Sequence, residues 1–376
     1  VEQFYYLLLN LQICYLTFIC HLLLVKAQYK LKLPCYYMKD CQQNCPRGGV
    51  SKVDPRFLIA AIETSDRNLD EMTSGSGVNG FYRPRSALAR AMYEKQHNDR
   101  YLLELDQNEW YRVNKERLSP DLIKKFVQLY PDEETNEFLS ASIDKSSWVW
   151  TQIWYLLAKA VLRHFWSVTD INGWLGRGSM FVLSEAQARA LLRPVGHSIG
   201  AGALVDVGAG DGEVSRRFAH IYPHNYATEI SASMRKTLAE KGYKLLDTEK
   251  WFSYRQFDCI CMLNLLDRCS KPKTMLKQAR DALAPGGVLM LALVLPYKPY
   301  VEVTVDHKPE ERLPIEGLYF EDQLATFVKF MREEAGFELV SWTRAPYLCE
   351  GDFAQAYYWL DDSVYVFKPT TVDPTT

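Results

Sequence analysis

The run from Leu204 to Gly212, Leu-Val-Asp-Val-Gly-Ala-Gly-Asp-Gly, constrains this chain more than any other stretch. A short apolar strand carries one acidic residue, Asp206, and glycines then follow at three alternate positions: Gly208, Gly210 and Gly212. Glycine is needed where a backbone turns tightly from strand to helix and a ligand lies against it. A dinucleotide fingerprint places its third glycine one residue later, where this chain has Glu213. The spacing therefore disfavours a dinucleotide site.

Short apolar runs alternate with helical patterns after this loop. The expected strands cover 204–207, 225–228, 243–246, 257–263 and 288–295. Between the first two, Val214, Phe218 and Ile221 fall on one helical face, and a second helix is expected over 272–284, before a Pro-Gly-Gly turn. Such an alternation predicts a parallel sheet covered by helices on both faces.

The end of the chain adds a different pairing. A helix over 321–335 precedes strand-like runs at 338–343 and 357–367, separated by a loop. This ending, together with a G-x-G-x-G loop two residues after an acid, is typical of class I S-adenosylmethionine-dependent methyltransferases. We therefore predict an α/β fold of this class, with a doubly wound seven-stranded sheet whose last pair is antiparallel.

The composition bounds the domain organisation and the substrate class. The chain has 376 residues, 48% of them hydrophobic, and a net charge of −2. It can bury the core of one large domain, expected at 201–370, with a helical extension at 107–200 and a tail at 371–376. No basic face for a nucleic-acid substrate is expected at this charge.

The helical extension contains several local signals. Ser119-Pro120 should cap a helix, and Ser184 and Gln187 have the form of a capping box. The helix expected over 147–166 carries four tryptophans, and we expect it to be buried against its neighbours. The glycine-rich segment 172–181 is too apolar for a solvated loop, and we expect it to fold over a ligand.

The first 106 residues carry few such signals. Residues 4–25 are almost all apolar, which predicts a signal peptide or membrane anchor over 1–27, the alternative being upstream sequence never translated in this form. Residues 28–106 are expected to be a poorly ordered linker. The nine cysteines do not form a disulfide pattern, and neither they nor the seven histidines predict a metal site.

The chain from about 107 to 368 resembles the DREV family, also called methyltransferase-like protein nine. The segments GRGSMF, NLLDRC and PYLCEGD are more specific than the glycine loop. The matching stretches are Trp110–Tyr111, Ser142–Trp148, Ile171–Phe181, Val205–Val214, Tyr226–Glu229, Leu263–Cys269, Ala292–Glu302 and Arg344–Asp352. The resemblance implies a protein-histidine methyltransferase that modifies the pros nitrogen in His-x-His segments. It also implies an association with the endoplasmic reticulum and mitochondria.

The predicted cofactor is S-adenosyl-L-methionine, and each residue of its expected binding site has a predicted role. Gly208 and Gly210 should let the backbone approach the cofactor, and Asp206 should orient the loop or bind the methionine amino group. Glu229 follows the second strand, where an acid binds the ribose hydroxyls. The family resemblance assigns Glu229, Asn264 and Tyr347 to the cofactor, with ordinary loop packing as the alternative for Tyr347.

Asp267 is the expected acceptor-side group. Histidine has a pKa near 6.5, so methylation needs the right tautomer rather than a strong base. A carboxylate that accepts a hydrogen bond from one imidazole nitrogen leaves the lone pair on the other. A helix-capping role for Asp267 is the alternative. Tyr358 is a second catalytic candidate, with strand packing as its alternative, and Arg177 and Ser179 could bind either the cofactor carboxylate or the substrate backbone.

Three functions stay open at this level. The first is a protein-histidine methyltransferase acting on His-x-His proteins, and the second is a class I methyltransferase of a small molecule. The third is a non-catalytic scaffold, which the intact glycine loop argues against. The expected location is the endoplasmic reticulum or mitochondrion, with membrane association through residues 4–25, or the cytoplasm if that segment is not translated.

Overall fold

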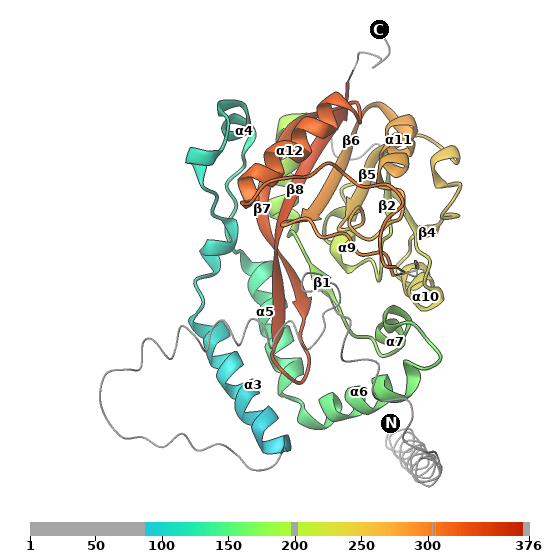
Figure 1. The fold of residues 1–376 in the computed structure, drawn as a ribbon. Helices are drawn as coiled ribbons and strands as arrows, with labels where there is room; N and C mark the ends of the chain where they lie inside the picture. The colour runs from blue at the N-terminus through green and yellow to red at the C-terminus, as the bar shows by residue number, and fades with distance from the viewer. Residues whose placement is uncertain (1–86, 197–201, 303, 305, 371–376) are drawn as a thin grey trace. The chain divides into compact units, whose positions relative to one another are not determined.

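The computed structural model describes residues 87–196, 202–302, 304 and 306–370, all within one compact unit, Val53–Thr376. Its centre is an eight-stranded sheet with the order β1-β7-β8-β6-β5-β2-β3-β4 (Figure 1). The strands are β1 Met180–Phe181, β2 Ala203–Val207, β3 His224–Thr228, β4 Lys244–Leu245, β5 Phe257–Leu263, β6 Leu283–Val294, β7 Phe337–Glu350 and β8 Tyr357–Pro369.

The pairing confirms the predicted fold class. Strands β4, β3, β2, β5 and β6 are parallel neighbours, and β8 runs antiparallel between β6 and β7. The eighth strand, β1, was not predicted: it pairs Met180 with Cys349 on the outer edge of β7. Two residues are too few to show a period-2 pattern, so only the tertiary fold reveals this strand.

Helices cover both faces of the sheet, as expected. They are α8 Glu185–Leu192, α9 Glu213–Ala219, α10 Ala232–Glu240, α11 Pro272–Ala282 and α12 Phe320–Glu333. Strand β5 shows the consequence for packing, because Ile260 and Met262 belong to one hydrophobic core cluster while Cys259 and Cys261 belong to the other. Alternate side chains of one strand thus enter opposite cores, and these cysteines act as small buried apolar residues.

Two predicted connections lie inside strands. The Pro-Gly-Gly sequence at 285–287 falls within β6, where the pairing with β5 shifts register between Phe257 and Cys259, and Gly286 has φ 80°. The loop predicted after residue 343 is also wrong, because β7 continues to Glu350. A proline such as Pro346 is rarely found in a central strand. Strand β1 pairs with β7 only at Leu348 and Cys349, so at Pro346 the strand β7 forms the edge of the sheet.

A group of helices precedes the sheet. They are α3 Ala87–Glu104, α4 Pro120–Lys125, α5 Glu133–Ser147, α6 Val149–Leu162 and α7 Val168–Trp174, with short 3₁₀ turns at Gln107–Tyr111 and Lys115–Arg117. The predicted caps are confirmed: Leu122 donates its N–H to Ser119 Oγ, and Ser184 and Gln187 form a capping box at α8. Residues 172–174, expected to be irregular, belong to α7.

Helix α3 lies within the segment predicted as a linker. Its residues are mostly good helix formers, and tertiary contacts hold it: Asp99 accepts from Ala356 N at 2.8 Å, and Asn98 donates to Ala354 O at 3.2 Å. Both partners belong to the connection between β7 and β8. Residues 28–86 of that linker and the apolar segment 4–25 lie outside the described residues. In the ranges that are described, no helix is long and apolar enough to cross a membrane.

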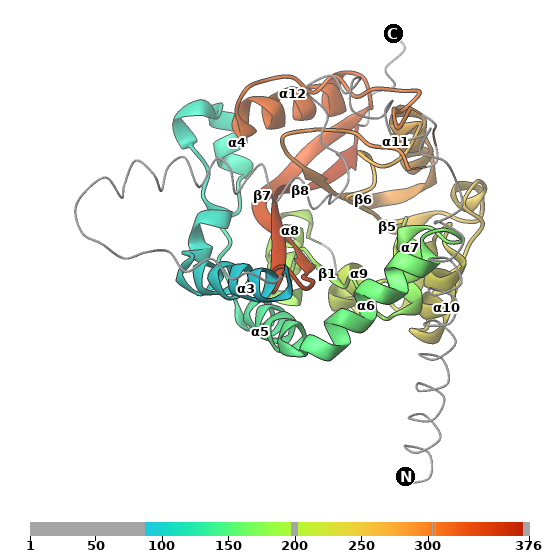
Figure 2. The same cartoon turned by 60° about the horizontal axis from the view of Figure 1, so that its bottom comes forward.

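The expected burial of the tryptophan-rich helix is wrong. Trp148, Trp150 and Trp166 are 62%, 83% and 46% exposed. In Figure 2, α6 and α7 lie at the periphery of the described part, and α7 packs against α10. The apolar pattern identified the helix correctly, but the pattern alone does not say which side of a helix meets the protein.

Candidate functional site

The glycine loop connects β2 to α9 at the carboxyl end of the parallel strands. Its glycines have left-handed backbone angles, with φ of 73° at Gly208, 58° at Gly210 and 76° at Gly212. The loop is tied to the neighbouring strand, because Thr228 O accepts from Gly208 N at 3.1 Å and from Ala209 N at 3.0 Å. Side chains with a Cβ rarely adopt these angles, which explains the glycines.

The three glycines differ in what surrounds them. A Cβ on Gly208 would lie 2.7 Å from Leu265, and one on Gly212 would lie 2.7 Å from Leu238, so both sites are close-packed. A Cβ on Gly210 would meet nothing within 4 Å. Gly210 is therefore the one glycine of this loop that faces open space.

Glu229 follows β3 and reaches back to the loop. Its Oε2 accepts from Gly210 N at 2.9 Å, and its Oε1 accepts from Ile230 N at 2.8 Å and Ser231 N at 2.9 Å. A carboxylate has about four acceptor positions, so about one stays free for a hydroxyl of a ribose. The structure thus places Glu229 beside Gly210, as the sequence predicts for the ribose ligand.

Asp206 lies in β2 beneath the loop and is 2% exposed. Burial raises the pKa of this carboxyl group to about 7, and a hydrogen bond from Ser215 opposes that rise. Such burial favours the first of its two predicted roles, which is to support the loop rather than to contact the methionine amino group.

Asn264 directly follows β5 and has an unusual backbone angle for a residue that is not glycine, φ 58°. Its Nδ2 donates to Asp362 Oδ2 at 2.9 Å, whereas its Oδ1 is buried and has no hydrogen-bond partner. Backbone outliers cluster at functional sites, and an unpaired buried acceptor calls for an explanation. The unpaired oxygen fits a donor supplied by a bound molecule.

Asp362 was missed by sequence reasoning. It is fully buried in β8, also accepts from Ser363 N at 2.9 Å, and burial raises its pKa to about 8. The sequence does contain a sign that Asp362 is special, because Asp361 and Asp362 interrupt an otherwise apolar strand-forming run. Acidic residues inside a predicted strand call for a functional or structural partner, and here the partner of Asp362 is Asn264.

Asp267 lies in the turn after β5 and is 7% exposed. Its Oδ1 has no hydrogen-bond partner, its Oδ2 lies 3.5 Å from Arg268 Nε, and burial raises its pKa. The capping alternative is wrong, because the next helix, α11, begins at Pro272 with Lys271 as its N-cap and no side-chain cap. Asp267 is thus a buried carboxylate with an unused oxygen.

Tyr347 lies in β7 rather than in a loop. It is half-buried, and its hydroxyl contacts Met180 Sδ. Its pKa is raised well above the usual range by burial, with smaller contributions from Asp267 and Asp362. The tyrosine therefore belongs to the same neighbourhood as these two carboxyl groups.

Tyr358 lies further along the β7–β8 hairpin. It faces Cys349 across the hairpin, and its hydroxyl donates to Asp352 Oδ1 at 2.9 Å. Tyr358 lies four positions before Asp362 along β8, which corresponds to about 13 Å. The structure therefore places Tyr358 on the same face of the hairpin as Asp362 but does not bring it into contact with Asn264 or Asp267.

Arg177 and Ser179 belong to the connection between α7 and β1. The guanidinium of Arg177 donates to Gln152 Oε1 at 3.0 Å and to Gly351 O, and lies 3.6 Å from Glu350 Oε2. Ser179 O accepts from Glu350 N at 2.9 Å. These contacts tie the segment to the hairpin, so the structure gives both residues positioning roles instead of a contact with the glycine loop.

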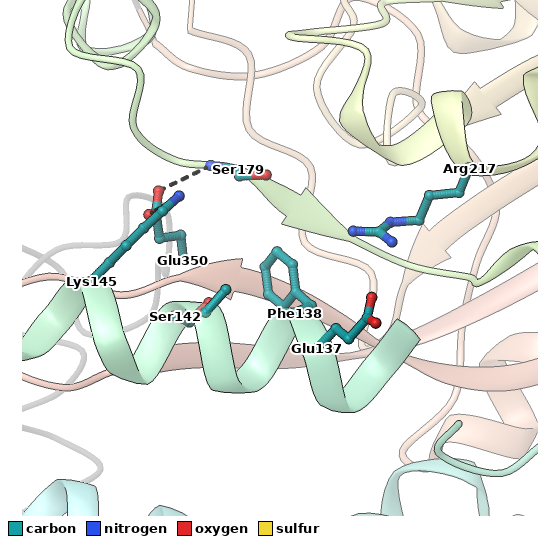
Figure 3. A pocket seen from close by; sticks show the side chains of 8 residues that line it. Glu137, Phe138, Ser142, Lys145, Ser179, Arg217 and Glu350 are labelled. Carbon is teal, nitrogen blue, oxygen red and sulfur yellow. Dashed lines mark hydrogen bonds and ion pairs between the residues drawn. The ribbon is translucent and has the colours of Figure 1, made fainter. Parts of the chain in front are cut away.

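A polar cavity of about 260 Å³ lies beside this connection (Figure 3). Side chains of α5 line one wall and face Ser179 and Arg217, and Lys145 Nζ lies 3.0 Å from Glu350 Oε1. Its lining residues are Glu137, Phe138, Ala141, Ser142, Lys145, Ser179, Arg217 and Glu350. Apart from Ser179, which is a candidate for the cofactor carboxylate or the substrate backbone, none of them belongs to the predicted cofactor site.

The residues at the carboxyl edge fit S-adenosyl-L-methionine. Gly210 borders open space, Glu229 offers a carboxylate beside it, and Asn264 holds an unpaired acceptor at the end of β5. No group of three or more His, Cys, Asp or Glu side chains that could hold a metal ion occurs among the residues with described positions.

Comparison with known proteins identifies the family of this chain. The model of the DREV methyltransferase family matches residues 110–369. Solved structures similar to this chain include the N-methyltransferase NodS from Bradyrhizobium japonicum in complex with S-adenosylhomocysteine, with 15% identity, coverage of 49% of this chain and 87% of NodS, and a TM-score of 0.33. Another is the DhpI complex with S-adenosylhomocysteine, with 16% identity, coverage of 62% and 99%, and a TM-score of 0.33.

A third similar structure is an S-adenosylmethionine-dependent methyltransferase from Clostridium acetobutylicum, with 12% identity, coverage of 57% and 96%, and a TM-score of 0.33. Because these TM-scores are low, the assignment of this chain to a protein family depends on the family match and on the strand order. The chain belongs to the DREV methyltransferase family and is an S-adenosyl-L-methionine-dependent methyltransferase.

Proposed function

We propose that this methyltransferase modifies the pros nitrogen of histidine in His-x-His segments of proteins. The observation that carries the proposal is the buried Asp267 carboxylate, whose Oδ1 lacks a partner three residues after Asn264. The family resemblance supplies the substrate class, and the geometry supplies a group suited to an imidazole.

Methyl transfer from a sulfonium is an in-line displacement, and the bound cofactor supplies an electrophilic methyl group. The protein must then hold the acceptor in line and exclude water. Asp267 Oδ1 can accept a hydrogen bond from the tele N–H of histidine, which leaves the lone pair on the pros nitrogen. After transfer the ring carries a positive charge until that N–H proton leaves, and Asp267 can take it.

The burial of Asp267 suits this second step. A carboxyl group whose pKa is raised binds a proton more tightly than a free aspartate does, so its proton affinity moves toward that of imidazole. The neighbouring carboxyl group of Asp362 is held by Asn264 and Ser363 and is already occupied. Asp267 is therefore the better candidate to face the acceptor.

The hairpin offers a surface for the rest of the peptide. Two histidines separated by one residue lie on the same side of an extended chain, about 7 Å apart. One face of β7–β8 carries Tyr347 near the carboxyl groups and Tyr358 further out. A peptide along this face can place one imidazole at Asp267 and the next against a tyrosine ring.

The test compares substrates with the purified full chain. Peptides with His-x-His, Ala-x-His and His-x-Ala, together with the imidazole dipeptide carnosine, are incubated with labelled S-adenosyl-L-methionine, and the product isomer is identified after hydrolysis. We expect pros-methylhistidine from His-x-His peptides and little product from the alanine peptides.

Methylation of carnosine in preference to every peptide would support the small-molecule alternative. Tele-methylhistidine as the main product would contradict the role given to Asp267. Binding of S-adenosyl-L-methionine without turnover on any of these substrates would contradict the proposed substrate class, while leaving the cofactor site intact.

A further inference from the structure

Asp362 is a fully buried carboxyl group, and each of its oxygens has a hydrogen-bond donor. It lies in β8 opposite Val294 of β6 and Ala345 of β7, so both neighbouring strands meet it with apolar residues. Its Oδ1 accepts from Ser363 N at 2.9 Å, and its Oδ2 accepts from Asn264 Nδ2 at 2.9 Å. The N–H of Ser363 belongs to the backbone and cannot become an acceptor. Only the contact between Oδ2 and Asn264 can therefore reverse.

The backbone of Asn264 is held in place, whereas its side-chain amide has two possible orientations. Asn264 N donates to Ala292 O of β6 at 3.0 Å, which fixes the point from which the side chain leaves the backbone. A half-turn of the amide exchanges Nδ2, a donor, for Oδ1, an acceptor, at nearly the same position. The shape of the residue stays the same, but the group that it offers to a ligand changes from an acceptor to a donor.

An ionised Asp362 permits only one of these orientations. In the observed orientation, Nδ2 of Asn264 donates to Asp362, and Oδ1 is the buried acceptor that has no partner. In the opposite orientation, Oδ1 would face Oδ2 of Asp362, and two acceptors would meet with no proton between them. Such an arrangement leaves two buried polar atoms unpaired and is therefore unfavourable. The acceptor that Asn264 offers thus depends on Asp362.

The ionisation of Asp362 and the binding of a donor at Asn264 are linked. Burial raises the pKa of Asp362 to about 8, Asp267 adds to the rise, and the hydrogen bond from Asn264 opposes it. A protonated Asp362 would donate to Oδ1 of Asn264 and turn the amide around. A ligand that donates to Oδ1 competes with that proton, so its binding favours the ionised carboxylate and the observed orientation.

We propose that Asp362 is a positioning residue that holds the amide of Asn264 so that Oδ1, and not Nδ2, faces bound S-adenosyl-L-methionine. The cofactor has N–H donors in its ammonium group and in its adenine amino group, and an amide oxygen matches either of them. The parallel strands β2 and β5 place Asn264 at the same edge of the sheet as Gly210. The proposal concerns the cofactor and does not depend on the identity of the methyl acceptor.

Asp362→Asn tests the proposal directly, because it keeps the shape of the side chain and reverses one contact. Ser363 N still requires an oxygen, so the nitrogen of the new amide faces Asn264 and donates to its Oδ1. Asn264 then presents Nδ2 to the donor of the cofactor, and two donors meet. We expect the affinity of the purified full chain for S-adenosyl-L-methionine, measured by calorimetry, to fall at least about tenfold.

Combining Asp362→Asn with Asn264→Asp exchanges the two groups of the pair. The carboxylate at position 264 then accepts from the amide at position 362 and offers its other oxygen to the cofactor, so we expect most of the lost affinity to return. Asp361→Asn is the matched control, because Asp361 is the preceding residue, pairs with Arg344 at 2.6 Å and has a side chain that is 43% exposed. Melting temperatures establish which variants are folded. If Asp362→Asn alone does not fold, the double variant provides the test.

S-adenosylhomocysteine separates the orientation of the amide from the charge of Asp362. This molecule has the same ammonium and adenine amino groups but a neutral sulfur, so a reversed amide should weaken the binding of both ligands by a similar factor. A loss confined to S-adenosyl-L-methionine would mean that Asp362 acts on the sulfonium charge, and it would overturn the proposal. So would near-normal affinity in a folded Asp362→Asn variant, or an affinity of the folded double variant at least about tenfold below that of the wild type.

Discussion

At the carboxyl edge of the sheet, apolar side chains are buried and polar groups gather at a site, whereas α6 buries a polar residue and exposes several apolar ones. Asn264 and Asp362 meet above a core of aliphatic strands. In α6, Gln152 is buried while Trp150 is exposed. The first region follows the usual division between core and surface, and its unpaired oxygens indicate a ligand. The second departs from that division, because a buried glutamine lies on the same helix as exposed apolar side chains.

The largest effect should come from filling the open space at the glycine loop. Gly210→Arg would place a long side chain where nothing now lies within 4 Å, so binding of S-adenosyl-L-methionine measured by calorimetry should be lost. Gly286→Arg is the matched control, because Gly286 also has a left-handed φ and open surroundings but lies at the opposite end of the strands. Equal loss of cofactor binding in both variants would mean that backbone strain alone explains it.

The next effect concerns turnover. Asp267→Asn should lower the single-turnover rate roughly 10²–10⁴-fold while leaving cofactor affinity nearly unchanged, because the amide cannot take the proton. Single-turnover methylation, calorimetry and melting temperature are measured on the same preparation. A folded variant with a near-normal rate would remove Asp267 from the proposed mechanism.

The next effect concerns the stability of the polar contacts that hold the inward face of α6, compared with an exposed ion pair elsewhere. Glu350, 8% exposed, accepts from Gly178 N at 2.9 Å and lies beside Arg177 and Lys145. Glu350→Gln leaves Arg177 buried without its anion, so we expect a loss of about 3–5 kcal/mol in the free energy of unfolding. Glu240→Gln, in an exposed ion pair with Lys236, should change it little. Similar results for the two variants would contradict the polar packing of α6.

The smallest effect is a pH dependence of stability. The folded-state pKa of Asp206 is raised to about 7 from a usual value near 3.8, so between these values the folded state holds a proton that the unfolded state has lost. This group therefore makes stability fall as pH rises toward 7. Compared with Asp206→Asn in denaturant titrations, the wild type should lose on the order of 1–3 kcal/mol more between about pH 5 and about pH 7. Parallel pH profiles would contradict the burial of an ionisable group beneath the loop.

Much of the sheet edge was predictable because its signals are local. A strand of apolar residues, a glycine turn and an acid at the end of the next strand each occupy a few consecutive residues. Parallel strands then bring Gly210, Glu229 and Asn264 to one edge. Asp362 was not predicted as part of the site, because its contact with Asn264 joins residues 98 positions apart.

The sequence by itself determined the fold class, the loop and the residues that border it, since periodicity and turn chemistry are written in neighbouring positions. Only the tertiary structure decided that Tyr347 lies in a strand, that Arg177 is held by the hairpin, and that the apolar stripe of α6 faces outward. An amphipathic helix has two faces, and its sequence specifies both without stating which one meets the protein. Here Arg177 binds the polar face, because a buried guanidinium needs hydrogen-bond acceptors and Gln152 supplies one of them.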